Sequence, residues 1–217
     1  MLTLVCVHLV GMRALAGGPE VDAAIVLVVD MSESMDADER RILRDSHAHA
    51  IASDTVLEAI GEGEFGRVAF AYVEFGNEPV IRVSWSIVDG RDSAKRFSEQ
   101  ILAAPMANLG FTGIGGGLEV ARVMLAFCPC RPTKRVVDVA ADGKNNTHPS
   151  IFLARQALLD MGAAINGLPI EIRPWDADIA AYFAEHVIGG PAAFNLPVTG
   201  MDELPDRLRQ KILLDLY

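Results

Sequence analysis

Residues 23–30 read Ala-Ala-Ile-Val-Leu-Val-Val-Asp, an unbroken run of apolar, mostly branched residues that ends in a carboxylate. A run of this kind, without polar residues at alternate positions, is typical of a strand that is covered on both faces of its sheet. Parallel sheets with such strands carry helices on both sides. The segment therefore predicts an α/β fold in which Asp30 stands at the carboxyl end of a buried strand.

The rest of the chain alternates between strand-like and helix-like segments. Further strands are predicted at 67–75, 80–88, 135–140, 163–168 and 193–198, and helices at 38–60, 93–103, 116–127, 150–161, 176–187 and 202–216. The strands on either side of the short turn Gly76–Pro79 are expected to form a hairpin. Because no linker, repeat or low-complexity tract divides the chain, we predict one doubly wound, mostly parallel, six-stranded sheet of the Rossmann-like kind. It has one antiparallel edge strand and helices on both faces.

Composition narrows the range of partners. Hydrophobic residues make up 51% of the 217 positions, which predicts a well-buried core. Lys and Arg number 19 against 29 Asp and Glu, so the net charge is −10 and argues against nucleic acid or an anionic membrane surface as the main partner. No uncharged apolar stretch reaches the ~18 residues of a spanning helix, so we predict no transmembrane segment.

The N-terminal segment allows two interpretations. Residues 2–12 are mostly apolar, and Ala14–Ala16 is typical of a signal-peptide cleavage site, although the one nearby charge, Arg13, follows the apolar stretch instead of preceding it. As a signal peptide, residues 1–16 would be removed, and 17–217 would be a periplasmic or extracellular domain. As a retained part of the fold, the same segment would fit a cytoplasmic protein. We favour export.

Two cysteines remain outside this segment, Cys128 and Cys130, separated by one proline. We favour a pair of thiols in the turn that ends a helix, because this spacing is too short for a relaxed disulfide between regular elements. A strained redox-active disulfide is the alternative for an exported protein. Two cysteines without further His or Cys pairs are also too few for a structural zinc site.

Hydroxyl and carboxylate side chains follow the first strand. Asp30, Ser32 and Ser34 alternate with other residues, so an extended turn can point their three oxygens the same way. Side-chain oxygens on a short loop suit Mg²⁺, which prefers hard ligands in octahedral geometry. The pattern alone is a weak signal, because Asp and Ser also favour turns and helix caps.

Two later loops add oxygens to the same edge of the predicted sheet. Thr112 opens a predicted helix after a glycine-containing loop, and Asp142 follows the strand at 135–140, with Gly143 permitting a sharp turn. Ligands of doubly wound sheets bind at the carboxyl ends of strands, where the winding direction reverses. We therefore expect the three loops to converge on one small cation.

Together these residues resemble the metal-ion-dependent adhesion site (MIDAS) of the von Willebrand factor type A (vWA) domain. The matching residues are the D-x-S-x-S motif at Asp30, Ser32 and Ser34, the loop threonine Thr112 and the strand-end aspartate Asp142. The order of elements is similar to that domain from about residue 21 to 216. Segments 72–75, 165–168 and 187–191 are similar to a bacterial branch catalogued as a domain of unknown function.

The resemblance implies a metal-dependent protein-binding module without chemistry of its own. Mg²⁺ would be bound directly by Ser32, Ser34 and often Thr112, and largely through water by Asp30 and Asp142. Mn²⁺ and Ca²⁺ are the expected substitutes. One coordination position stays open for a carboxylate on a partner protein. Relatives often carry a small polar residue just before the strand-end aspartate, where this chain has Ala140-Ala141. The departure concerns the residues around the ligands, which affect the affinity for metal, and not the ligands themselves.

Two alternatives remain. The chain could be a Mg²⁺-dependent hydrolase such as a phosphatase, with Asp30 as the nucleophile, or a structural domain whose metal site has decayed. Aspartate-based phosphatases carry a second carboxylate two residues after the nucleophile, where this chain has Ser32, and a phosphate-binding lysine, for which Lys144 is the one candidate in these loops. An enzyme is therefore not expected.

Three other features are ambiguous or weak. Glu74 lies at the end of the second predicted strand, near the edge of the sheet that carries the predicted metal site. Its carboxylate could orient a loop there or be exposed to water. His148 follows the Asp142 loop and could reach the rim of the site, although a solvated histidine is the more common case. The glycines of Gly61–Gly66 fit G-x-G-x-x-G but precede a strand, which predicts a turn and not a dinucleotide site.

Overall fold

The structure is a computed structural model that describes residues 17–173 and 178–217. Residues 1–16, on which the export prediction depends, lie outside the described residues. The described part forms one five-stranded sheet in the order β3-β2-β1-β4-β5. Its strands are β1 (Glu20–Asp30), β2 (Val68–Phe75), β3 (Val80–Val88), β4 (Arg131–Ala141) and β5 (Ala164–Pro169). All neighbours are parallel except the β2–β3 hairpin, which places β3 as the antiparallel edge strand.

Strand β1 lies in the middle of the sheet and is covered on both faces, as its sequence predicts. Ile25, Leu27 and Val29 point into one core, whereas Val26 and Val28 point into the other. All five side chains are fully buried. Burial of apolar area on both faces at roughly 25 cal/mol per Å² makes this strand a main source of the stability of the fold.

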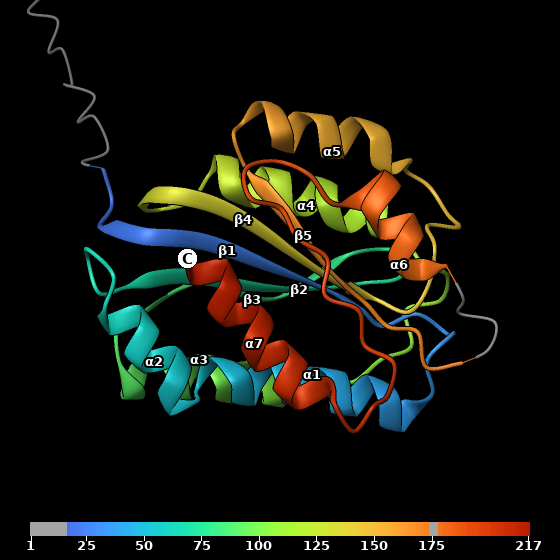
Figure 1. The fold of residues 1–217 in the computed structure, drawn as a ribbon, viewed down its shortest axis with the longest axis horizontal. Coiled ribbons are helices and arrows are strands. Elements are labelled where there is room, and N and C mark those ends of the chain that lie inside the picture. Colours follow the sequence, from blue (N-terminus) through green and yellow to red (C-terminus); the bar gives the residue numbers. More distant parts are fainter. Residues whose placement is uncertain (1–16, 174–177) are drawn as a thin grey trace, which may run out of the picture.

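Helices form a layer on each side of the sheet (Figure 1). The first layer comprises α1 (Ala37–Ile51), α2 (Asp54–Gly61), α3 (Arg91–Ala103) and α7 (Leu204–Leu216). The second comprises α4 (Ile114–Ala126), α5 (Ile151–Asp160), α6 (Ile179–Tyr182) and the π-helical turn η2 (Phe183–Val187). This is the doubly wound arrangement that the sequence predicts, with β1, β2, β4 and β5 ending at one edge of the sheet.

The prediction of a sixth regular strand at 193–198 is wrong. The segment lies beside β5 and forms only isolated bridges, which pair Gly167 with Asn195 and Ile170 with Val198. Pro197 has no N–H to donate to a ladder, so regular pairing stops there. The segment still covers the edge of β5 with single backbone hydrogen bonds, including Leu196 N–H to Gly167 O at 2.9 Å.

Two predicted helices differ in their extent. The helix predicted at 38–60 is two helices, α1 and α2, separated at Ala52–Ser53, where the Ser53 hydroxyl donates to the carbonyl oxygen of Ala50 at 2.7 Å. The helix predicted at 176–187 is present as α6 and η2, which run from Ile179 to Val187, and residues 176 and 177 lie outside the described residues. Residues 62–67 form the predicted turn, in which the Asp22 carboxylate accepts the N–H groups of Phe65 and Arg67.

Cys128 and Cys130 are joined by a disulfide, so the favoured expectation of two thiols is wrong and the alternative of a bonded pair holds. The turn after α4 brings their Cα atoms to 5.2 Å, a separation that a disulfide can span. A search of the described residues finds no helix with the length and apolar character needed to cross a membrane.

Charged side chains are buried between the sheet and α7, in what we call the interior ion cluster: Asp138, Asn166, Lys211 and Asp215. The Lys211 ammonium lies 2.7 Å from Asp138 and 3.5 Å from Asp215, and the Asn166 amide donates to Asp215 at 2.7 Å. Lys211 and Asp138 are fully buried. Burial raises the pKa of Asp215 well above its usual range, against the opposing effect of Lys211.

Candidate metal centre

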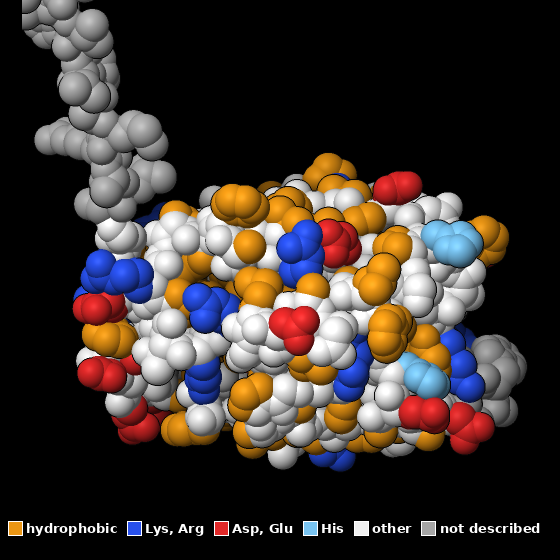
Figure 2. Space-filling model, turned by 90° about the horizontal axis from the view of Figure 1, so that it is seen from above, with side chains coloured by type: hydrophobic (Ala, Val, Ile, Leu, Met, Phe, Trp, Pro, Cys, Tyr) orange, Lys and Arg blue, Asp and Glu red, His pale blue; other side chains and the backbone are white. Residues whose placement is uncertain are grey.

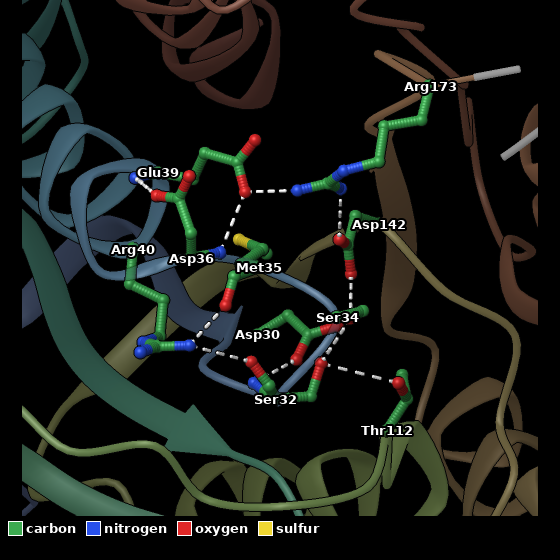
Figure 3. A network of polar contacts seen from close by, with 10 residues as sticks. All are labelled: Asp30, Ser32, Ser34, Met35, Asp36, Glu39, Arg40, Thr112, Asp142 and Arg173. Atoms are coloured by element: carbon green, nitrogen blue, oxygen red, sulfur yellow. Dashed lines mark hydrogen bonds and ion pairs between the residues drawn. The ribbon is translucent and has the colours of Figure 1, made fainter.

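The three polar loops meet at the edge where the strands end, and the five predicted site residues lie together there (Figure 3). The first loop turns sharply because the Asp30 carboxylate accepts the backbone N–H of Ser32 at 2.8 Å. This turn places the hydroxyl oxygens of Ser32 and Ser34 2.8 Å apart. The Thr112 hydroxyl approaches that of Ser32 at 3.3 Å, and the Ser34 hydroxyl donates to Asp142 at 2.5 Å. We call these five residues the loop cluster.

Helix α1 begins directly after the first loop and has a well-formed start. Asp36 caps the helix by accepting the N–H groups of Asp38 and Glu39, and the Glu39 carboxylate accepts the N–H of Asp36. A reciprocal capping box of this kind satisfies backbone donors at the helix start. The loop is therefore held between the end of β1 and a fixed first turn of α1.

Backbone hydrogen bonds connect the three loops to one another. The N–H of Leu109 donates to the carbonyl oxygen of Met31 at 2.8 Å, and the N–H of Glu33 donates to that of Gly110 at 2.7 Å. Thr112 exchanges two hydrogen bonds with Asn146, one backbone to backbone and one to the amide oxygen of the side chain. The side-chain oxygens of the cluster are thus held in place by the backbone before any ligand binds.

The third loop approaches the second so closely that only glycine fits at one position. A Cβ atom on Gly143 would lie 2.9 Å from the hydroxyl oxygen of Thr112. Gly143 lies outside the left-handed region of backbone conformation, so the predicted role in a sharp turn is not what requires glycine here. The glycine instead leaves room for Thr112 beside Asp142.

Electrostatics favour a cation at this place. Asp30 is fully buried, and its oxygen Oδ2 has no hydrogen-bond partner among the residues that the structure describes. Burial and, second, the charge of Asp142 raise the pKa of Asp30 to about 8. A carboxylate in such surroundings is stabilised in its charged form by a nearby positive charge.

The donor set fits a hard divalent cation. No group of three His, Cys, Asp or Glu side chains within residues 17–173 and 178–217 is arranged to hold a metal ion. The loop cluster instead combines two carboxylates with three hydroxyls, the all-oxygen set that suits Mg²⁺ better than zinc or copper. Ser32, Thr112 and both aspartates are buried, whereas Ser34 is exposed and opens the cluster to solvent.

Two buried arginines on α1 hold the loops, and the sequence analysis did not identify either. Arg40 donates from Nη1 to the carbonyl oxygen of Ser32 at 3.2 Å and to that of Met35. Arg44, one turn later, donates to the carbonyl oxygens of Ala104 at 2.6 Å and Pro105 at 3.1 Å. The first arginine thus fixes the loop of Ser32, and the second fixes the start of the loop that leads to Thr112.

Glu74 orients the second loop through Arg44. Its carboxylate is fully buried and accepts from Arg44 Nε at 2.8 Å and from Arg82 Nε at 2.7 Å. The interpretation of Glu74 as an edge carboxylate in water is therefore wrong. The interpretation as a residue that orients a loop agrees with these contacts.

A third arginine, Arg173, follows β5 and spans the first and third loops. It donates from Nη1 to Asp142 Oδ2 at 3.1 Å and from Nη2 to the carboxylate of Glu39 (Figure 3). Arg173 thus places a positive charge beside Asp142. The other two residues considered near the site point elsewhere: the Lys144 ammonium lies 5.9 Å from the centre of the Tyr182 ring, and His148 lines a cavity next to α5.

Comparisons with known proteins agree with this geometry. A family model described as "Protein of unknown function (DUF1194)" matches residues 20–217. Comparison with curated proteins gives no match. The family match covers all five residues of the loop cluster.

Solved structures with a similar fold include proteins of animals and bacteria. One is proximal thread matrix protein 1 (PTMP1) from the mussel byssus with a zinc-occupied MIDAS motif, at 19% identity and a TM-score of 0.64, covering 92% of this chain and 48% of that one. Another is a von Willebrand factor type A protein from Catenulispora acidiphila, at 15% identity and a TM-score of 0.62, covering 89% and 42%. A third is the vWF domain of the type V pili tip protein Mfa5 from Porphyromonas gingivalis, at 13% identity and a TM-score of 0.64, covering 91% and 97%.

These likenesses establish the fold, which is that of a vWA domain, as the resemblance in the sequence predicted. This chain spans about half the length of the mussel protein. At identities below 20%, the partners and ligands of the three neighbours are properties of those proteins.

Proposed function

This chain belongs to the family of unknown function DUF1194, and we propose that it is a metal-ion-dependent protein-binding module with its metal at the loop cluster. The proposal assigns the metal to Asp30, Ser32, Ser34, Thr112 and Asp142. A metal bound there would supply a positive charge and an open coordination position for a carboxylate of a partner protein. A mussel neighbour with a zinc-occupied MIDAS motif supports binding of a divalent cation at this place in the fold.

The buried carboxylate of Asp30 is the observation that carries the proposal. Its oxygen Oδ2 has no hydrogen-bond partner among the described residues, and three hydroxyl oxygens stand close by. A buried carboxylate with one oxygen left without a hydrogen bond lowers the stability of a fold unless a cation compensates it. We propose Mg²⁺ as that cation because all the donors are hard oxygens, with Mn²⁺ or Ca²⁺ as substitutes.

The proposed residues divide the work between holding the ion and leaving it reactive. Hydroxyls of Ser32, Ser34 and Thr112 carry no charge, so they would leave much of the charge of the ion uncompensated. Asp30 and Asp142 would act largely through water, with Arg173 already neutralising part of Asp142. Such an ion binds an external carboxylate well, which is the chemistry of a binding module.

We propose that residues 17–217 act as one binding domain outside the cytoplasm. The Cys128–Cys130 disulfide supports this, because disulfides persist mainly in oxidising compartments. A pilus tip protein and a thread matrix protein among the neighbours support the same location and a role in protein–protein contact. Removal of residues 1–16 as a signal peptide belongs to this proposal.

The hydrolase alternative receives no support from the side chains around Asp30. Ser32 stands where a phosphatase would carry its second carboxylate, and the Lys144 ammonium lies over the Tyr182 ring, 5.9 Å from its centre. A hydrolase would also require a general base positioned beside the attacking group, a role that no residue of the loop cluster was assigned. We therefore propose capture of a partner, and not cleavage, as the function.

Thermal unfolding of the full chain tests the metal site. Stability is measured in EDTA and in increasing Mg²⁺ or Mn²⁺ for the parent, Ser32→Ala and Thr112→Ala. A ligand that binds only the folded state stabilises it by about 2.7 kcal/mol at a hundredfold excess over Kd, so a saturable rise is expected in the parent and a much smaller one in both variants.

Ser98→Ala is the matched control, because Ser98 is a buried hydroxyl on α3 that takes no part in the loops. This variant is expected to respond to metal as the parent does. If parent and variants all melt at the same temperature with and without metal, the site does not bind these cations and the proposed function is wrong.

A further inference from the structure

A cavity of about 580 Å³ lies next to the third loop, between α5 and the α6–η2 segment. Its lining includes Asn145 and His148 from the loop side, Phe152 and Arg155 from α5, and Tyr182 and His186 from α6 and η2. The function proposed above does not use this cavity. Its size and its mixed aromatic and polar lining are those of a site that holds a side chain or a small ligand.

The cavity is joined to the metal loop through Asn145, three residues after Asp142. The Asn145 N–H donates to the hydroxyl of Tyr182 at 3.2 Å, and its side-chain oxygen accepts the N–H of Gly115 at 2.9 Å, near the start of α4. One short segment therefore supplies both a residue of the loop cluster and a wall of the cavity. Asp142 of the loop cluster and Asn145 of the cavity lining are thus three positions apart along the chain.

Aromatic rings line the cavity, and its charged lining residues are one arginine and one glutamate, with a lysine beside it. The centres of the Tyr182 and His186 rings lie 4.9 Å apart, and the Lys144 ammonium lies over the Tyr182 ring. Arg155 lines the cavity while donating to the carbonyl oxygen of Ile188 at 2.6 Å. Glu185 is the one acidic residue in the lining among the residues described. Arg155 and the neighbouring Lys144 thus outnumber Glu185 here, in a chain whose net charge is −10.

Exposed apolar side chains extend the same surface. Phe152 and Leu153, at the start of α5, are 70% and 76% exposed, and Phe111, beside Thr112, is 53% exposed. The face that carries α4 and α5 shows hydrophobic side chains among polar ones, with histidines towards one end (Figure 2). Large exposed apolar residues next to a cavity are typical of a protein-binding surface.

A contact between a metal and one carboxylate is too small to select a protein partner. Stable protein interfaces bury about 800 Å² on each side and depend on a few aromatic or cationic anchors in pockets. The cavity and its apolar rim are suited to that role. Positive groups at Lys144 and Arg155 complement an acidic segment, and the rings of Tyr182 and Phe152 complement an aromatic side chain.

We propose that the cavity binds an aromatic side chain of the partner, in the same acidic segment whose carboxylate binds the metal. The inference rests on the proposed function and extends it from a single carboxylate to a two-point recognition of sequence. The partner segment thus carries an Asp or Glu and, a few residues away, a Trp, Tyr or Phe.

Synthetic peptides test this recognition. Each is fluorescein-labelled and contains one aspartate and one tryptophan separated by between one and six glycines, and a control series replaces the tryptophan with glycine. Fluorescence anisotropy with the full chain measures the affinity in Mg²⁺ and in EDTA. We expect at least one spacing to bind in Mg²⁺ about tenfold more tightly than its control, a typical gain for a buried aromatic anchor.

Variants separate the cavity from the metal. Phe152→Asp is expected to lower the affinity of the best peptide to that of its control, with Mg²⁺ stabilisation of the protein unchanged. Tyr182→Ala is expected to lower the peptide affinity as well, and its Mg²⁺ stabilisation is measured alongside, because this variant also removes the acceptor of the Asn145 N–H. Phe127→Asp is the matched control, since Phe127 is 80% exposed at the far end of α4. Because Phe152 is mostly exposed, its substitution tests the cavity even if Tyr182→Ala does not fold.

The outcomes distinguish the two proposals. Mg²⁺-dependent binding that does not depend on tryptophan, or that survives both cavity substitutions, overturns the cavity proposal and leaves the metal function intact. Tryptophan-dependent binding that is equal in Mg²⁺ and EDTA contradicts the metal function instead. Absence of binding by every peptide at millimolar concentration overturns the cavity proposal.

Discussion

The interior ion cluster and the loop cluster both bury two carboxylates, but they compensate them differently. In the interior, Lys211 lies within 3.5 Å of both Asp138 and Asp215, so the chain supplies the cation itself. At the loops, Arg173 contacts Asp142, whereas Asp30 keeps an oxygen without a partner among the described residues. The carboxylates of the interior ion cluster are thus compensated within the fold, whereas the carboxylate of Asp30 is available to a cation from solution.

The largest expected effect comes from removing the interior cation. Lys211→Met leaves Asp138 and Asp215 buried without their counter-ion, and breaking a buried pair in this way costs about 3–5 kcal/mol of unfolding free energy. Urea denaturation measures the loss. Arg91→Ala is the control, because it removes an ion pair whose partners are 72% and 69% exposed and which contributes less than about 1 kcal/mol. Equal losses in both variants would contradict the comparison.

Replacing Asp30 is expected to raise the stability of the metal-free protein, whereas replacing Lys211 lowers it. Its pKa is about 8 in the fold against 3.8 for the free side chain, so the folded state holds a proton that the unfolded chain releases. Stability in EDTA should therefore fall as the pH rises from about 4 to about 8, by up to about 5 kcal/mol. Asp30→Asn should remove the Asp30 share of this dependence, leaving that of the buried Asp215, and raise the stability at pH 8, while abolishing stabilisation by Mn²⁺.

Urea denaturation at several pH values in EDTA measures this effect. Asp54→Asn, at an exposed carboxylate on α2, serves as the control and should keep the pH profile of the parent. A parent protein whose stability is flat between pH 4 and pH 8 would show that Asp30 is already compensated. The contrast with the interior cluster would then disappear.

The smallest effect concerns a residue that holds the loop without belonging to it. Arg40→Met removes the hydrogen bonds to the carbonyl oxygens of Ser32 and Met35, so the first loop loses its support from α1. Residues that orient metal ligands typically contribute about 10–100-fold in affinity, and we expect a loss near tenfold for Mn²⁺ by calorimetry. Arg41→Met, at the exposed neighbour, should leave the affinity unchanged. An unchanged affinity in Arg40→Met would restrict Arg40 to a role in folding.

Much of the fold could be predicted because its signals are local. The apolar run of β1 and the polar residues at the ends of β1 and β4 indicate a buried sheet with a site at its carboxyl edge. The predicted sixth strand was wrong because Pro197 interrupts the ladder that its neighbours favour. The favoured prediction of two thiols at Cys128 and Cys130 was wrong because the turn after α4 brings the two residues into a geometry that spacing alone does not indicate.

The supporting arginines could not be predicted because their partners are distant or featureless in the sequence. An arginine on a helix normally indicates an exposed charge, and Arg40 and Arg44 bind carbonyl oxygens, which every residue possesses. Arg44 reaches a loop 60 residues away. The one detectable signal is that both arginines, four residues apart, fall on the face of α1 that also carries the buried Leu43 and His47.

The loop cluster also sets an order in time. Ser32 and Thr112 are 80 residues apart, and Ser34 and Asp142 are 108 residues apart. Contacts over such separations form slowly, after the intervening chain has been made and collapsed. A growing chain therefore holds no complete cluster until β4 has joined β1. We expect metal to be taken up by the finished domain, where it slows unfolding without guiding the earlier steps of folding.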